Sequence, residues 1–249
     1  VTVINGRRPG LQHVAPYDFR RPSRFSKEHQ RTLQQIHEQF ARGFATALSS
    51  FLRLNVRAQV TSVEQTSFED YADSLPNPTI IYVIHIPQFD GPITFELPVE
   101  PTRIMLDRLC GGPGLPVAGI QQLTEIERSL LKPLGRHIAH GIADAWGPFV
   151  QIEPVVEDVL LNPRAARAVT PNDIAALITF DLAVGDIAGQ MSVCLPHRSL
   201  DPVMEQLSTQ VWAIDPGLAE SSAAETAIRH RLLNCLLYTS PSPRDRQKS

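Results

Sequence analysis

The sequence predicts an α/β domain built from two similar halves, with a central mixed or antiparallel sheet flanked by long amphipathic helices. Two observations support this prediction. Apolar and turn-forming residues recur at a constant offset of 98 positions, and in each half one long helical pattern precedes several short strand patterns. A repeat of this kind indicates a pseudo-twofold duplication in which two copies of one unit bury a shared core.

Each half opens with a long helix. Ser26 is a suitable N-cap for the first one, and apolar residues then follow at steps of three and four. The stripe predicted to face the core is Leu33, Ile36, Phe40, Phe44, Ala47, Leu48 and Phe51. Its counterpart 98 positions later is Leu131, Leu134, Ile138, Ile142, Ala145, Trp146 and Phe149. The second helix opens with a capping box at residues 124–127 and contains Pro133, which we expect either to kink the helix or to mark a late start of its regular part.

Three strands and a short helix are predicted after each long helix. The expected strands are 56–64, 79–86 and 92–97 in the first half and 152–161, 175–184 and 188–195 in the second. Glycine-containing turns at 90–92 and 185–187 join the last two strands of each half. Because strands joined by tight turns run antiparallel, this pattern favours a mixed or antiparallel sheet over a doubly wound parallel one.

Composition limits the classes of function. The net charge of −3 and the hydrophobic content of 43% are ordinary for a globular protein, and the basic residues near the start indicate a solvated surface rather than a nucleic-acid site. The three cysteines are far apart and form no disulfide framework. No apolar run approaches the roughly 20 residues that a membrane-spanning helix needs. We expect a cytoplasmic protein, or one held at a membrane through a partner.

The repeat also suggests domain boundaries. We divide the chain into an N-terminal arm (1–24), a duplicated domain (25–210, with halves of about 25–110 and 123–208), a linker (211–234) and a C-terminal tail (235–249). The tail is polar and rich in Pro and Ser, and we expect it to be disordered. It is either a native linker or a non-native extension. Val1 is not a natural start residue, so we interpret the chain as a fragment.

One tetrapeptide at the seam between the halves has no counterpart in the second half: Gly111-Gly112-Pro113-Gly114. In one interpretation Gly111 ends the preceding helix and the remainder is a linker. In the other, the segment is a docking loop in which small residues keep side chains out of the contact and proline limits the entropy lost on binding. Asp107 and Arg108, on the last helical turn before the loop, are candidates for polar contacts beside it.

Five segments of the sequence together resemble the FliM family of flagellar motor switch proteins. They are PYDFRRPSRFSKE (16–28), TLQQIHE (32–38), SLPNPT (74–79), LCGGPG (109–114) and LTEIE (123–127), within a likeness that extends from about Pro16 to about Asn234. The resemblance implies the middle domain of the family, a CheC-like α/β/α duplication. It also implies a non-enzymatic subunit of the ring at the cytoplasmic base of the bacterial flagellum, on the face of the inner membrane, where it controls rotation in chemotaxis.

The resemblance further implies a set of partners. These are FliG at Gly111–Gly114 and the adjacent Asp107 and Arg108, neighbouring copies of the same subunit, phosphorylated CheY, and FliN through a C-terminal domain. The CheY-binding peptide of the family would precede Val1, and its FliN-binding domain would follow about Ala227. We therefore expect the fragment to bind phosphorylated CheY weakly and to lack FliN docking.

Two alternatives remain open at this point. One is a CheC-type phosphatase, which would need Glu-x-x-Asn on its helices to orient a water for attack on an aspartyl phosphate. The corresponding positions are Gln35 and Glu38 in the first helix and Pro133 and Arg136 in the second, and the chain contains no Glu-x-x-Asn. The other alternative is a structural subunit of a related secretion apparatus.

Searches for other chemistry favour structural explanations. His137 and His140 have a spacing found in metal sites, but they lack further ligands nearby, so we expect surface residues. Cys110 is interpreted as a small buried residue that closes a helix rather than a reactive thiol. The glycine loop lacks the Lys-Ser/Thr of a phosphate-binding loop. The sequence therefore predicts no catalytic, metal or cofactor site.

Overall fold

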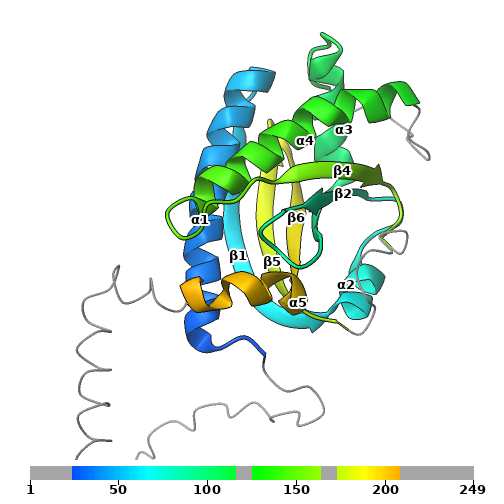
Figure 1. Cartoon of the computed structure of the whole chain (residues 1–249). Helices are drawn as coiled ribbons and strands as arrows, with labels where there is room; N and C mark the ends of the chain where they lie inside the picture. Colours follow the sequence, from blue (N-terminus) through cyan, green and yellow to red (C-terminus); the bar gives the residue numbers. More distant parts are fainter. Residues whose placement is uncertain (1–23, 116–124, 164–172, 208–249) are drawn as a thin grey trace, which may run out of the picture.

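The computed structural model describes residues 24–115, 125–163 and 173–207, which form one six-stranded sheet with helices packed on it (Figure 1). The strand order is β1-β5-β6-β3-β2-β4, and every pairing is antiparallel. The strands are β1 (Val56–Ser67), β2 (Ile80–His85), β3 (Ile93–Leu97), β4 (Val155–Leu160), β5 (Ile174–Val184) and β6 (Ile187–Pro196). The helices are α1 (Lys27–Leu52), α2 (Phe68–Ser74), α3 (Val99–Leu109), α4 (Glu125–Trp146) and α5 (His197–Leu200), followed by a 3-10 turn, η2 (Asp201–Val203). The prediction of an α/β fold with an antiparallel sheet is confirmed.

The sheet has the pseudo-twofold symmetry that the repeat predicts. If β1 is exchanged with β4, β2 with β5 and β3 with β6, the result is the same strand order read from the opposite edge of the sheet. The register agrees, because the pair Arg57↔Ala183 becomes Val155↔His85 at the 98-residue offset and both pairs are present. Each half thus adds its first strand to the hairpin of the other half. Neither half completes a sheet alone, so the two copies form one domain.

The hairpins are the place where the two halves differ. Ile80 pairs with Leu97 in the first half, and the offset of 98 would pair Ile178 with Leu195. Ile178 instead pairs with Val193, so the second hairpin is shifted by two residues. The cause is a tight turn, since Val184 pairs with Ile187 and leaves only two residues between the strands. The first hairpin has a longer connection.

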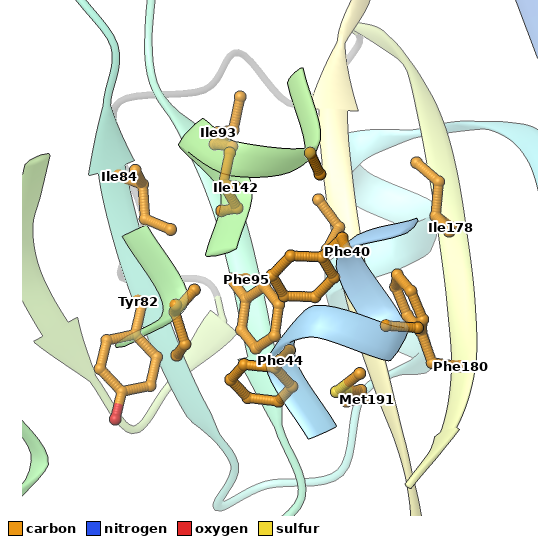
Figure 2. Packing of buried hydrophobic residues seen from close by; sticks show 14 of the residues in the cluster. Phe40, Phe44, Tyr82, Ile84, Ile93, Phe95, Ile142, Ile178, Phe180 and Met191 are labelled. Carbon is orange, nitrogen blue, oxygen red and sulfur yellow. The ribbon is translucent and has the colours of Figure 1, made fainter. Parts of the chain in front are cut away.

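The helix α1 begins at the predicted cap and buries most of its predicted stripe. Ser26 Oγ accepts a hydrogen bond from the His29 amide (3.1 Å), and His29 Nδ1 accepts one from the Ser26 amide (3.4 Å), which makes a capping box with histidine in the place of glutamate. Phe40 and Phe44 stack with ring centroids 5.1 Å apart, and both meet Phe95 of β3 edge to face. Figure 2 shows this aromatic centre of the core.

Two residues of the predicted stripe lie outside the core. Ala47 is exposed, and Phe51 keeps 39% of its surface exposed. Phe51 packs instead against the ring of His137 on α4, with centroids 4.4 Å apart. Their counterparts Ala145 and Phe149 are buried, so the two long helices are not equivalent at their ends.

The helices cover the two faces of the sheet unequally. Side chains of α1, α3, α4 and α5 share one large hydrophobic cluster with one face. On the other face, Phe68, Tyr71 and Ala72 of α2 pack on Val83, Ala175 and Cys194. The sequence predicted no helix at α2, although Ser67 caps it by accepting from the Asp70 amide (3.1 Å). None of the helices in the described ranges is long and apolar enough to cross a membrane.

Other predictions about the elements are confirmed in outline. The helix α4 continues through Pro133 rather than starting after it, while Thr124 and its capping box lie outside the described residues. The short helix predicted after the strands of the first half is α3, Val99–Leu109. Most of the N-terminal arm, together with the linker and the tail, falls on residues 1–23 and 208–249, which are also outside the described part, so these boundaries remain predictions.

Candidate functional site

The glycine loop follows α3 through a regular helix-terminating motif. The Gly111 amide donates to the Arg108 carbonyl (3.0 Å), and the Gly112 amide donates to the Asp107 carbonyl (2.8 Å). This is the pair of hydrogen bonds of a Schellman motif, in which the residue after the cap adopts a left-handed conformation. Gly111 has the expected φ of 87°. The interpretation of Gly111 as the helix stop is therefore confirmed, and the loop begins from a defined orientation.

The side chain of Asp107 binds the end of the loop, at Gly114 and Leu115. Its Oδ2 accepts hydrogen bonds from the Gly114 amide (2.7 Å) and the Leu115 amide (3.3 Å). A Cβ on Gly112 would overlap this carboxylate. A side chain at 112 would displace this carboxylate from its hydrogen bonds to the loop, so glycine at 112 contributes to the internal packing of the loop. This role differs from the sequence-based explanation that glycine keeps a side chain out of a contact.

Arg108 ties the loop to the end of α1. Its Nε donates to the Leu52 carbonyl (3.0 Å), Nη2 lies 3.5 Å from the Arg53 carbonyl, and Nη1 donates to the Gly112 carbonyl (3.0 Å). Gly114 has φ of 82°, and a Cβ there would lie 2.9 Å from Arg108 Cδ and 3.2 Å from Leu54 Cδ1. Asp107 and Arg108 are thus engaged inside the loop, whereas the sequence offered them as contacts to a partner.

The outer surface of the loop is small and apolar. Cys110, Gly111, Pro113 and Leu115 are exposed, and Leu115 keeps 63% of its surface accessible. The prediction that Cys110 is buried is wrong, because the helix stop turns its side chain outward. Leu115 was not among the residues predicted to contact a partner. The sequence feature that could have identified it is an aliphatic residue directly after a Pro-Gly turn, with no periodic apolar pattern around it.

A buried polar cluster lies at the centre of the sheet, beneath α2. Thr79 donates to Glu96 Oε1 (2.5 Å), Ser192 donates to Glu96 Oε2 (3.3 Å), and the Tyr71 hydroxyl lies 3.2 Å from Ser192 Oγ. Burial raises the pKa of Glu96 from its ordinary 4.5 to about 7, although both hydroxyls favour the charged form. Perturbed acids often mark catalytic sites. Glu96 is only 3% exposed, however, so this cluster is a structural junction rather than a site for a ligand.

The positions that a CheC-type phosphatase would use do not form an active pair. Gln35 is exposed, and Glu38 accepts a hydrogen bond from Gln34 Nε2 (3.0 Å) on the same helix. Pro133 and Arg136 supply neither a carboxylate nor an amide. The second helix therefore lacks both groups, and the first carries an amide and a carboxylate in the reverse order, so neither helix has the Glu-x-x-Asn arrangement.

The histidines divide between the surface and the core. His140 is exposed and lies 2.9 Å from Asp144, as expected of a surface residue. His37 is buried; its Nδ1 donates to the Leu33 carbonyl (2.7 Å), and burial lowers its pKa to about 4. Within the described ranges, no three His, Cys, Asp or Glu residues are grouped so that they could hold a metal ion.

A second concave surface lies between α4 and the edge strand β4. This groove has a volume of about 990 Å³ and carries basic side chains and one carboxylate from α4, with further carboxylates from the β4 segment. Its charged lining consists of Lys132, Arg136, His140, Asp144, Glu153, Glu157 and Asp158. Val155, which is 56% exposed, adds an apolar side chain. The groove has no buried polar group aimed into it among these residues, so it gives no indication of a small-molecule ligand.

The fold and the site together define a duplicated α/β domain that presents a preformed, solvent-exposed loop at the seam of its two halves. Comparison with known proteins then identifies the family. The family described as "Flagellar motor switch protein FliM" matches residues 26–212. The chain belongs to this FliM family.

Individual relatives agree with the family assignment. The chain is 35% identical to the flagellar motor switch protein FliM of Borreliella burgdorferi over 93% of its length and 66% of that protein. It is 37% identical to FliM of Thermotoga maritima over 80% of its length and 60% of the relative. The chain thus spans roughly three fifths to two thirds of the curated relatives it matches.

The fold is similar to crystal structures of the family. A chain in the crystal structure of a FliG–FliM complex from H. pylori superposes with a TM-score of 0.70 at 27% identity, covering 72% of this chain and 99% of that one. The crystal structure of the FliM middle domain from H. pylori gives a TM-score of 0.67 at 26% identity, over 73% and 99% of the two chains. The described residues therefore have the fold of FliM middle domains.

Proposed function

We propose that this chain is the middle domain of a non-enzymatic flagellar motor switch subunit and that it binds FliG through residues 110–115. The observation that carries the proposal is the loop itself. It is shaped by internal hydrogen bonds that Asp107 accepts and Arg108 donates, and Pro113 and Leu115 are exposed on it. A loop that is already ordered loses little conformational entropy when it binds, which favours affinity.

The similarity to a chain from a FliG–FliM complex supports FliG as the partner. In this proposal the exposed residues Pro113 and Leu115 form the contact, while Asp107 and Arg108 hold the loop in its binding shape. This division of roles follows from the hydrogen bonds, since the polar groups of both residues already have partners within the domain.

The proposal extends to the switch as a whole. The subunit would occupy the cytoplasmic base of the flagellum, held at the inner membrane through its partners, and contact neighbouring copies of itself in a ring. Binding of phosphorylated CheY would change the orientation of FliG and so the direction of rotation. FliN would bind a C-terminal domain beyond the described residues. The loop at the seam supports only the FliG contact, and the family membership supports the rest.

Affinity measurements with a matched pair of variants test the FliG contact. Leu115 and Val155 are two exposed aliphatic residues, 63% and 56% accessible, on the loop and on β4 respectively. Burial of one aliphatic side chain contributes about 1.5–3 kcal/mol, so Leu115→Ser should weaken FliG binding by roughly tenfold or more. Val155→Ser should leave the affinity unchanged. Equal affinities for wild type and Leu115→Ser would exclude the loop as the FliG site.

A further inference from the structure

The guanidinium of Arg108 contacts two parts of the chain that lie far apart in sequence. Two of its nitrogens face the carbonyls of Leu52 and Arg53, at 3.0 and 3.5 Å, and the third donates to the carbonyl of Gly112. The first two carbonyls lie at the end of α1, where a helix leaves its last carbonyl groups without partners within the helix. A positive charge is favourable there because of the helix dipole. Arg108 therefore caps α1 and holds the loop with the same planar group.

The connection between α1 and the loop is reinforced by packing. Arg53 adopts a left-handed conformation with φ of 52° at the end of α1, which directs the chain toward Leu54. Leu54 Cδ1 would lie 3.2 Å from a Cβ on Gly114, so the two segments are in close contact. The turn after α1 is closed by Ser49, whose Oγ accepts from the Val56 amide at 3.0 Å. Ser49 has no hydrogen bond to the loop among the described contacts.

The helix α1 crosses the whole domain (Figure 1). Its first turn is next to Phe25, whose ring meets that of His197 with centroids 5.1 Å apart, and its last turn meets the loop. The equivalent of Arg108 in the second half is Gln206, which lacks the planar fork of donors. The arrangement is therefore specific to the half that carries the loop.

We propose that Arg108 is a positioning residue that couples the last turn of α1 to the glycine loop, so that the two change conformation together. The functional consequence of this inference rests on the proposed function. If the loop binds FliG, a displacement of α1 would change the shape of the loop and hence its affinity for FliG. Because coupling between two sites is reciprocal, FliG binding would in turn order the last turn of α1.

A double-mutant cycle in the free protein tests the coupling. The reporters are the exchange rates of the Gly112 and Gly114 amides, which donate to the Asp107 carbonyl and carboxylate, measured by NMR on the whole chain. Ser49→Ala, which removes the two hydrogen bonds between Ser49 Oγ and the Val56 backbone, should accelerate loop exchange about fivefold or more, as expected when at least one net hydrogen bond is lost. In an Arg108→Gln background the same Ser49→Ala change should have less than a twofold effect.

Two further variants separate coupling from general stability. Arg108→Lys keeps the charge but not the fork of donors, so loop exchange should fall between wild type and Arg108→Gln. Arg42→Gln removes an exposed arginine from α1 and should leave loop exchange unchanged. Urea unfolding of each variant distinguishes a local change in exchange from a global one. Equal effects of Ser49→Ala in both backgrounds, wild-type rates for Arg108→Lys, or faster exchange in Arg42→Gln would each overturn the inference.

FliG binding provides the functional readout. Arg108→Gln should weaken FliG binding at least fivefold, and unchanged affinity would show that the coupling does not reach the contact surface. If Leu115→Ser leaves FliG binding intact, the proposed function fails, but the exchange cycle in the free protein still decides whether Arg108 couples the two segments.

Discussion

The buried Glu96 should contribute a stabilisation of the domain that is lost as the pH rises from about 4.5 to about 7. Its pKa is raised from 4.5 in an exposed carboxyl to about 7 in the fold, so the native state binds a proton more tightly than the unfolded state. The stabilisation is complete below pH 4.5 and is lost as the pH rises to 7. At about 1.4 kcal/mol for each pH unit, this loss amounts to about 3 kcal/mol of unfolding free energy.

His37 acts in the opposite direction over nearly the same range. Burial lowers its pKa from 6.5 to about 4, so the unfolded state binds the proton more tightly. Stability therefore rises by about 3 kcal/mol between pH 4 and 6.5 and is lost on acidification. The two contributions largely cancel between pH 4.5 and 6.5. Because the two groups titrate over nearly the same range, single substitutions are needed to observe either contribution.

Single substitutions should separate the two contributions. Glu96→Gln keeps a hydrogen-bonding group beside Thr79 and Ser192 but cannot ionise. Relative to wild type, its unfolding free energy should therefore increase with pH by about 3 kcal/mol between pH 4.5 and 7. His37→Gln should show the reverse relative change between pH 4 and 6.5. Urea unfolding monitored by circular dichroism from pH 4 to 8 measures both. A constant difference between Glu96→Gln and wild type across this range would refute the reasoning.

Three further substitutions test the packing and the caps. Phe40→Ala should lower the unfolding free energy by about 3–5 kcal/mol in urea titrations, because Phe40 lies at the aromatic centre of the core and is 2% exposed; a loss under 1 kcal/mol would contradict that placement. Ser26→Ala should cost about 1 kcal/mol in the same assay through loss of the α1 cap, and no loss would show that the capping box does not form. Gly112→Ala should displace Asp107 and so accelerate hydrogen exchange of the Gly114 amide. The control Gly43→Ala, at an exposed helical site with free space, should leave that exchange rate unchanged. Equal exchange rates in the two variants would contradict the loop packing.

Much of the fold follows from patterns that the sequence displays directly. The 98-residue repeat predicted six strands and two long helices, because periodic apolar residues report which face an element buries. The helix α2 was missed since seven residues are too few for a periodic pattern, although Ser67 and Asp70 have the spacing of a cap. His37 occupies the apolar face of α1, between Leu33 and Phe40, but its polar side chain did not indicate burial.

The loop was found from the sequence, but its internal organisation was not. Three glycines and a proline indicate unusual backbone, and a helix stop at Gly111 was one of the two interpretations that the sequence left open. Arg108 binds carbonyl groups that are remote in sequence, and Asp107 binds backbone amides whose directions are set by the turn. The contact of Arg108 with the carbonyl of Leu52, 56 residues away, has no local signal. The exposure of Leu115 likewise results from the turn geometry.

Hydrogen exchange with and without FliG tests the central claim most directly. The backbone amides of residues 110–115 should become protected when FliG is added, and those of β4 (Val155–Leu160), at the edge groove, should not change. Mass spectrometry of peptides across the whole chain measures both regions in one experiment. Protection at β4 and α4 with unchanged exchange in the loop would contradict the account.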